Sequence, residues 1–561
     1  MHRLKKIGKI FLKVFIGFGI FLILFALFFW WRIQVPLPEI NKNLSPSSFT
    51  RKQIATNYYR VNDCWLKKNK YGIWEMYIEG DAYERGLIYG VLAKELIEKQ
   101  ETYFVNQINE LVPGKIYQNV LKCFIAWFNK DMYKYLPEEN QQEIYGISLS
   151  FSDKFDYVGP KYYRILNYHA AHDIGHALSD FSMVGCTSFA LTKEFSEDSN
   201  LLIGRNFDFY MGDDFARDKL LVFVNPKTGY KFASYSWAGL TGVVSGMNEM
   251  GLTVTINASK SDFPFASKEP ISILAREILQ YAKNTEEAIT IAKKREIFVS
   301  ESLLIGSAED DKAIIIEKSP QKMDVYSGDK NLWICANHYQ SKLFMLDSVN
   351  LLNISNSDSK YRFNRMKELL DSSLPLNQNK AVQILRNKEG AGNKNIGLGN
   401  PKSLNQLIAH HSVVFKPKQM KMWISTSPYQ LGGFICYDLR EAFKKNGQYI
   451  VDSLTIKEDA FLQDERYKKY EQFKNTKQKI KKFVLFNIPF SLDTTAETAF
   501  IQANPDSYIT YMELGDYYKK IKKYEKANTY YLQALDHDVA SVNETEVLKK
   551  NISVCKKNQS K

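Results

Sequence analysis

Two short segments carry most of the information in this 561-residue chain: Gly185-Cys186-Thr187-Ser188-Phe189-Ala190-Leu191 and, after a polar turn, Gly204-Arg205-Asn206-Phe207-Asp208. The alternation in the first segment predicts a half-buried strand, and residues 201–209 predict its hairpin partner. This pairing places Arg205 and Asp208 across from Cys186. A cysteine thiol is mostly protonated at neutral pH unless a cation or base lowers its pKa. The hairpin therefore predicts a cysteine nucleophile with an arginine and a carboxylate beside it.

These segments resemble the cysteine-type N-terminal nucleophile (Ntn) hydrolases. Within them they look most like the autoproteolytic acyl-CoA:6-aminopenicillanate acyltransferase-like family (peptidase C45), with bile-salt hydrolases and penicillin V acylases as more distant relatives. The resemblance implies that the chain cuts its own Gly185–Cys186 bond, so that Cys186 becomes a new terminus. The freed α-amine, with a reference pKa of about 7.7–8.0, would then serve as the base.

Three further motifs extend the resemblance: Gly246-Met-Asn-Glu-Met-Gly-Leu-Thr-Val-Thr-Ile-Asn257, Trp333-Ile-Cys-Ala-Asn337-His-Tyr, and a predicted helix start at Asp358 that leads to Arg362. The resemblance implies that Asn257 and Asn337 stabilise the oxyanion of the reaction. It also implies that an arginine after Asp358 supports the site. Arg362 is our assignment, and Arg365, one turn later, is the alternative.

The pattern after Cys186 predicts strands, helices and strands again, which is an α+β fold. Strands are expected at 219–224, 231–238, 242–245, 252–257, 302–305, 313–317, 322–326 and 332–336, with one helix over 271–293. The resemblance implies a four-layer αββα sandwich for a catalytic domain over 186–454. It also implies that residues 51–185 are a helical pro-segment, retained as a small subunit. Residues 375–418 are expected to be a polar loop-and-helix region with His410 and His411 at the surface.

The amino terminus predicts a transmembrane signal anchor over residues 1–32. Five basic residues precede an uncharged run from Val14 to Trp31, and a span needs about 17–25 residues. The charge bias places the catalytic domain on the extracytoplasmic (periplasmic) side. Residues 33–50 are a linker rich in Pro, Ser and Asn.

Residues 455–561 form a different tail, a basic linker followed by a helical pattern over 507–540 that resembles one tetratricopeptide (TPR) repeat. The small and large positions of the repeat are matched by Tyr511, Leu514, Gly515, Tyr518, Ala527, Tyr531 and Ala534. A chance pairing of amphipathic helices is the alternative. The repeat is expected to pack on the catalytic domain, on a neighbouring helix or on a protein partner.

Composition argues against two classes of function, nucleic-acid binding and zinc binding. The net charge of +13 is modest for this length and no nucleic-acid motif accompanies it. The six cysteines contain no Cys-x-x-Cys pair, which argues against a zinc site. His169, His172 and His176 share one helical face and are the candidate metal ligands, but the resemblance supports neither a metal nor a cofactor, and we expect none.

The sequence thus predicts an enzyme that forms an acyl-Cys186 intermediate from a small acylated amide or thioester and passes the acyl group to water or an amine. A location outside the cytoplasm favours hydrolysis of an N-acyl amide. Two other classes remain open. One is a membrane-tethered scaffold whose TPR-like tail binds a partner beside a degenerate Ntn fold. The other is a conventional peptidase that uses Cys186 and His338 without self-cleavage.

Overall fold

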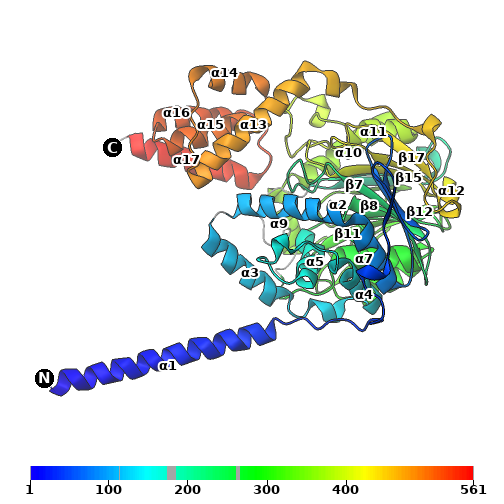
Figure 1. Ribbon diagram of the computed structural model, residues 1–561. Coiled ribbons are helices and arrows are strands. Elements are labelled where there is room, and N and C mark those ends of the chain that lie inside the picture. Colours follow the sequence, from blue (N-terminus) through cyan, green and yellow to red (C-terminus); the bar gives the residue numbers. More distant parts are fainter. Residues whose placement is uncertain (1, 113, 174–184, 261–263, 265, 560–561) are drawn as a thin grey trace.

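The computed structural model (Figure 1) describes residues 2–112, 114–173, 185–260, 264 and 266–559. The described strands form two sheets, one of 11 strands in the order β1-β2-β3-β4-β7-β8-β9-β10-β11-β12-β13 and one of six in the order β14-β5-β6-β15-β16-β17. The larger sheet consists of β1 (Lys52–Ala55), β2 (Tyr58–Val61), β3 (Cys64–Lys68), β4 (Trp74–Gly80), β7 (Lys219–Pro226), β8 (Phe232–Trp237), β9 (Ser245–Asn248), β10 (Leu252–Ala258), β11 (Glu301–Ser307), β12 (Lys312–Lys318) and β13 (Met323–Tyr326). The smaller sheet consists of β14 (Leu332–Cys335), β5 (Thr187–Leu191), β6 (Leu202–Phe207), β15 (His411–Lys416), β16 (Lys421–Ser425) and β17 (Phe434–Asp438).

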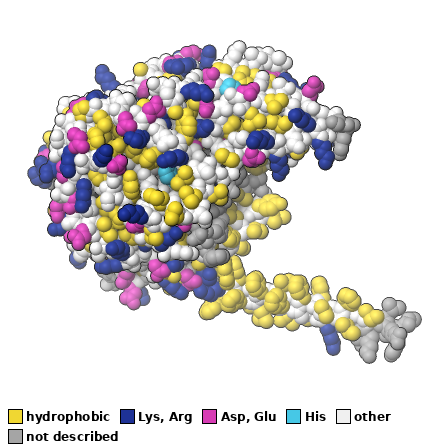
Figure 2. Space-filling model, turned by 180° about the vertical axis from the view of Figure 1, so that it is seen from behind, with side chains coloured by type: hydrophobic (Ala, Val, Ile, Leu, Met, Phe, Trp, Pro, Cys, Tyr) yellow, Lys and Arg dark blue, Asp and Glu magenta, His cyan; other side chains and the backbone are white. Residues whose placement is uncertain are grey.

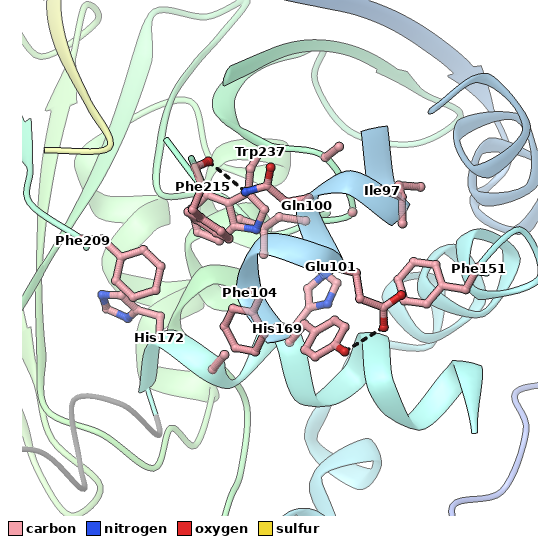
Figure 3. Close-up of a pocket in the computed structure, with 15 residues that line it drawn as sticks. Ile97, Gln100, Glu101, Phe104, Phe151, His169, His172, Phe209, Phe215 and Trp237 are labelled. Atoms are coloured by element: carbon pink, nitrogen blue, oxygen red, sulfur yellow. Dashed lines mark hydrogen bonds between the residues drawn. The ribbon is translucent and has the colours of Figure 1, made fainter. Parts of the chain in front are cut away.

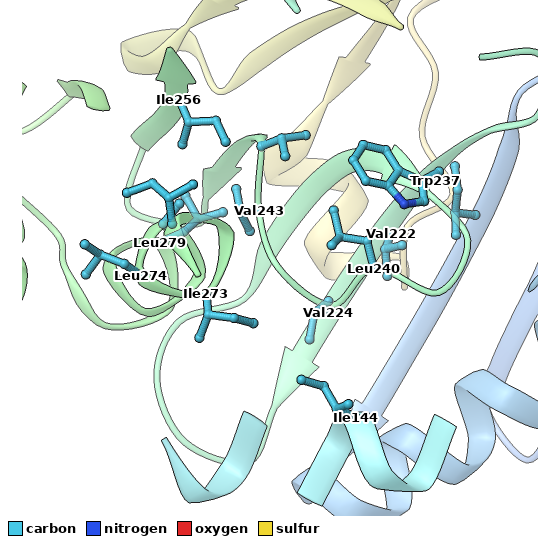
Figure 4. Packing of buried hydrophobic residues seen from close by; sticks show 14 of the residues in the cluster. Ile144, Val222, Val224, Trp237, Leu240, Val243, Ile256, Ile273, Leu274 and Leu279 are labelled. Atoms are coloured by element: carbon cyan, nitrogen blue, oxygen red, sulfur yellow. The ribbon is translucent and has the colours of Figure 1, made fainter. Parts of the chain in front are cut away.

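The two sheets share a buried hydrophobic cluster, to which the larger sheet contributes Leu221 and Tyr235 and the smaller sheet Ile203 and Val413. Each sheet also buries its other face. Helices α2 (Ala82–Leu111), α4 (Glu138–Ser148), α5 (Lys161–His169), α7 (Ile271–Tyr281) and α8 (Thr285–Lys294) share a second cluster with the larger sheet, part of which Figure 4 shows. Helices α10 (Ser359–Ser373) and α11 (Gln378–Leu385) share another with the smaller sheet. Because both faces of the larger sheet are covered, every residue of β10 and β11 is buried.

The segment before Cys186 differs from the helical pro-segment that we expected, because residues 52–80 form β1 to β4. Strand β4 pairs in parallel with β7, with Trp74 opposite Leu220 and Gly80 opposite Pro226. Trp74–Gly80 is rich in aromatic and apolar residues and five of its seven side chains are buried, a composition that favours a strand. This segment is therefore an integral part of the larger sheet.

Three further expectations differ from the structure. The helix expected over 271–293 is two helices, because the Asn284 side chain accepts a hydrogen bond from the Glu287 N–H and starts α8. The strand expected at 242–245 begins three residues later, as β9. Strand β15 was not expected, and His410 and His411, expected at the surface, are completely buried. Strands β6 and β16 pair with β15 on both sides, so β15 lies inside the smaller sheet although its sequence begins with polar residues.

Helix α1 (His2–Arg32) contains an apolar stretch, Ile10–Arg32, with a mean hydropathy of 2.7, long and apolar enough to cross a membrane. The remaining helices are α3 (Lys115–Asn129), α9 (Ser348–Asn356), α12 (Leu439–Lys444) and the tail helices α13 (Glu465–Phe486), α14 (Thr494–Ala503), α15 (Tyr508–Lys520), α16 (Tyr524–Leu535) and α17 (Val542–Gln559). Helices α15 and α16 pack closely, since a Cβ atom on Gly515 would lie 2.6 Å from the Tyr531 ring. Whether this pair is a TPR repeat stays a prediction.

Candidate active site

The β5–β6 hairpin brings Cys186 and Asp208 to the same end of the smaller sheet. Ser188 lies opposite Arg205 in the register, so Cys186 immediately precedes β5 and Asp208 immediately follows β6. The backbone extends this pairing by one more bond, from the Gly185 N–H to the Asp208 carbonyl at 3.1 Å. The structure agrees with the predicted hairpin, which brings Arg205 and Asp208 close to Cys186.

Arg205 joins the thiol to the larger sheet. One of its terminal nitrogens lies 3.7 Å from Cys186 Sγ and also donates to the Ile256 carbonyl. The other donates to the Val244 carbonyl and to Ser245 Oγ, at 3.1 and 2.7 Å. Burial raises the pKa of the Cys186 thiol to about 11 in this uncleaved chain, although the charge of Arg205 opposes that rise. The arginine thus partly offsets the cost of forming a buried thiolate.

Asp208 is completely buried, and its Oδ1 atom has no hydrogen-bond partner among the residues that the structure describes. Burial raises the pKa of its carboxyl to about 7, while the charges of Arg362 and Arg205 act in the opposite direction. Its Oδ2 atom accepts a hydrogen bond from Gln406 Nε2 at 3.4 Å. A carboxyl with this pKa can take up or release a proton near neutral pH.

Arg362 makes direct contact with the predicted scissile bond. One terminal nitrogen donates to the carbonyls of Gly185 and Cys186, each at 3.0 Å, and to Thr187 Oγ1 at 2.8 Å. The other donates to Asn337 Oδ1 at 2.8 Å. By contrast, Arg365 donates to the side chains of Asn387 and Asn393. The structure therefore brings Arg362, the assignment made from sequence, to the site.

Asn257 and Asn337 lie beside this centre, but their amide nitrogens are engaged by backbone carbonyls. Asn257 Nδ2 donates to the carbonyls of Cys335 and Ala336, at 3.1 and 3.3 Å. Asn337 Nδ2 donates to the Ala258 carbonyl at 2.7 Å. In this state the two asparagines connect β10 to the end of β14, and either would have to exchange a partner to act on an oxyanion.

The other histidine candidates have different partners. His338 Nδ1 is 2.7 Å from Ser359 Oγ, and burial lowers the pKa of the imidazole to about 3. His169 is bonded to the Ile165 carbonyl and to Thr241. His172 lies 3.1 Å from Asp173, and His176 is outside the described residues. The described partners of His338 thus give no support to a pairing with Cys186.

Sequence reasoning missed Gln406, His410 and His411. His411 Nε2 lies 2.9 Å from Ser245 Oγ, and the Nδ1 atoms of His410 and His411 are 2.8 Å apart. Burial lowers the pKa of both imidazoles well below its ordinary value. This neutral pair therefore supports Arg205 through Ser245. No local pattern marks these residues, because their partners belong to strands distant in sequence.

A pocket rich in aromatic side chains includes Phe209, the residue that follows Asp208 (Figure 3). It is lined from the chain before Cys186 and from the chain after it, including Ile97, Phe104, Phe209, Phe215 and Trp237. The centre of the Phe209 ring lies 5.7 Å from that of the Trp237 ring. The pocket therefore presents a mainly apolar lining, to which the chain on both sides of Cys186 contributes.

The chain is similar to known acyl-transfer proteins. The family model of acyl-coenzyme A:6-aminopenicillanic acid acyl-transferase matches residues 195–427. An uncharacterized protein of Archaeoglobus fulgidus is 26% identical over 275 residues, which are 45% of this chain and 45% of that protein. An N-acylethanolamine-hydrolyzing acid amidase of Caenorhabditis elegans is 24% identical over 255 residues, which are 41% of this chain and 63% of that protein.

Among solved structures, a Caenorhabditis elegans ortholog of N-acylethanolamine-hydrolyzing acid amidase aligns with a TM-score of 0.30 and 15% identity, over 42% of this chain and 93% of that one. The chain spans less than two thirds of the length of both curated relatives. By sequence, then, the chain is similar to a family of acyltransferases through residues 195–427, and part of it is similar to an amidase.

Proposed function

We propose that the chain is a self-cleaving Ntn amidohydrolase or acyltransferase whose nucleophile is Cys186. The observation that supports this most directly is the environment of the Gly185 carbonyl. It accepts hydrogen bonds from Arg362 and from Gln406, each at 3.0 Å, while the adjacent thiol contacts Arg205. Fixed donors at a carbonyl stabilise the negative charge that develops there during nucleophilic attack.

This geometry supports the following course of self-cleavage. The Cys186 sulfur attacks the Gly185 carbonyl carbon, its proton passes to the Asp208 carboxylate, and Arg362 stabilises the oxyanion. The peptide C–N bond then breaks, the Cys186 nitrogen takes a proton and leaves as an amine, and a thioester remains. Water hydrolyses the thioester, which gives a Gly185 carboxylate and a free amino-terminal thiol.

In the processed enzyme the α-amine of Cys186 accepts the thiol proton, and the thiolate attacks the carbonyl of a small acylated amide or thioester. Arg205 and Asp208 orient this pair, and Asn257 and Asn337 assist at the oxyanion. The acyl-Cys186 intermediate passes its acyl group to water or to an amine. The apolar pocket suits the acyl chain. Helix α1 anchors the chain in a membrane, with the catalytic domain on the extracytoplasmic side.

The test is the intact mass of the purified wild type beside Cys186→Ala and Cys186→Ser. We expect wild-type fragments that end at Gly185 and begin at Cys186, whereas Cys186→Ala remains one chain of 65.0 kDa. A folded wild type that stays intact contradicts the proposal. We also expect Asp208→Ala to abolish activity on an acylated amide and His338→Ala to leave that activity near the wild-type rate. An intact wild-type chain whose activity is lost in His338→Ala would favour the conventional peptidase.

A further inference from the structure

We infer that Gln406 is a second catalytic donor of the self-cleavage reaction, and that the helical tail positions it; this inference rests on the proposed function. Gln406 Nε2 donates to the Gly185 carbonyl at 3.0 Å and to Asp208 Oδ2 at 3.4 Å. The side chain is buried, and a Cβ atom on Gly185 would lie 2.3 Å from Nε2. The Gln406 amide therefore packs directly on the predicted scissile residue, and links the carbonyl under attack to the proton acceptor.

The chain that delivers Gln406 is irregular between α11 and β15, and the tail holds part of it. The Leu398 N–H donates to Asn504 Oδ1, and Asn504 Nδ2 donates back to the Leu398 carbonyl, both at 2.9 Å. Asn400 Nδ2 donates to the Asp538 carbonyl at 2.9 Å. Leu407, the residue after Gln406, belongs to the same hydrophobic cluster as the tail helices.

The catalytic domain holds the segment from the other side. Asn206 Nδ2 donates to the Leu404 carbonyl at 2.9 Å, and the Asn405 N–H donates to the Asn387 carbonyl at 2.8 Å. The segment thus bridges the tail and the nucleophile hairpin. Its position depends on both, because irregular backbone has no ladder of its own to fix a side chain.

A double-mutant cycle on the full chain tests this inference. Gln406→Ala, Asn504→Ala and their combination are synthesised in a cell-free system with lipid nanodiscs, and the cleavage rate is followed on gels. Loss of one oxyanion donor slows related reactions by about 10²–10³-fold, so we expect Gln406→Ala to slow cleavage at least tenfold. Asn504→Ala should slow it less, and should add nothing in the Gln406→Ala background. Lys549→Ala, at an exposed tail position, is the control.

Two results would overturn the inference. One is wild-type cleavage in Gln406→Ala. The other is an Asn504→Ala effect that is as large in the Gln406→Ala background as alone, which would show that the tail acts only through stability. If the wild type itself does not cleave, the proposed function fails instead. Thermal unfolding of the same variants in the Cys186→Ala background separates rate effects from unfolding.

A separate observation points to a membrane contact. The geometry of α3 and α1 leads us to propose that α3 lies in the surface of a lipid bilayer. Helix α3 exposes a row of apolar side chains at helical spacing: Ile116, Tyr117, Val120, Phe124 and Trp127. Ile116 and Tyr117 are 77% and 71% exposed. Figure 2 shows hydrophobic side chains protruding between α1 and the tail, where Figure 1 places α3.

The apolar face of α3 is continuous with the membrane helix. The Trp127 ring stacks on Phe29 of α1 at 5.7 Å, and Arg32 pairs with Asp131 at 2.8 Å. Aromatic residues beside the end of a membrane span suit the interfacial region. A bilayer already surrounding α1 would therefore also cover α3.

Cys123, an exposed cysteine in the middle of α3, carries the probe for the test. The full chain is labelled there with a fluorophore and placed in nanodiscs with brominated lipids. We expect strong quenching at Cys123 and little at a Glu546→Cys label in a Cys123→Ser background. Equal, weak quenching at both sites overturns the proposal. Energy transfer between labelled copies, without quenching by lipid, would assign the face to self-association and would also overturn it.

Discussion

At the residue scale, the proposed mechanism changes its base when the chain is cut, from the Asp208 carboxylate to the α-amine of Cys186. Before cleavage the Cys186 nitrogen is a peptide amide and cannot act as a base, so we assign the proton to the buried Asp208 carboxyl, at the same end of the smaller sheet. Its pKa, raised by burial to about 7, suits this task. After cleavage the α-amine is available. The same two side chains can thus serve first self-cleavage and then turnover.

The raised pKa of Asp208 predicts a pH-dependent effect of Asp208→Asn in the uncleaved Cys186→Ala background. The folded chain retains a proton that the unfolded chain loses between about pH 4 and pH 7, so the free energy of unfolding falls as pH rises through this window. The neutral amide removes that cost, worth about 1.4 kcal/mol per pKa unit. Thermal unfolding should show Asp208→Asn to be the more stable chain at pH 8, with a much smaller difference at pH 4. An equal difference at both pH values would contradict the assignment of the raised pKa.

At the element scale, the sequence pattern predicted those elements that depend on residues close together in the chain. The hairpin of Cys186 and Arg205, the helix start at Asp358 and most strands after residue 200 agree with the structure, although the Asp358 side chain makes no capping hydrogen bond. Strand β15 escaped prediction, since its burial comes from neighbours that pair with it across the sheet. Gln406 escaped for the same reason, because it lies 221 positions from Gly185. A single sequence carries no signal for such contacts.

At the scale of the whole molecule, the segments before and after Cys186 form one folded unit. Strand β4 lies between β3 and β7 in the larger sheet. Across the same boundary, the buried Glu143 carboxylate binds Arg85 at 2.7 Å on one side and Arg276 at 3.0 Å on the other. The aromatic pocket also takes side chains from both segments. The proposed cleavage of the buried Gly185–Cys186 bond would not require any of these contacts to break.

We therefore predict that the two fragments of the cleaved chain co-elute in size-exclusion chromatography and separate only in denaturant. Glu143→Leu leaves Arg85 and Arg276 buried without a counter-charge, and breaking a buried pair in this way costs about 3–5 kcal/mol. The urea concentration at which the fragments separate should fall markedly in this variant. Asp371→Ala, which removes an exposed pair with Lys367, should change it little because such pairs contribute about 0–1 kcal/mol. Equal midpoints for Glu143→Leu and the wild type would mean that the fragments associate through the sheet alone.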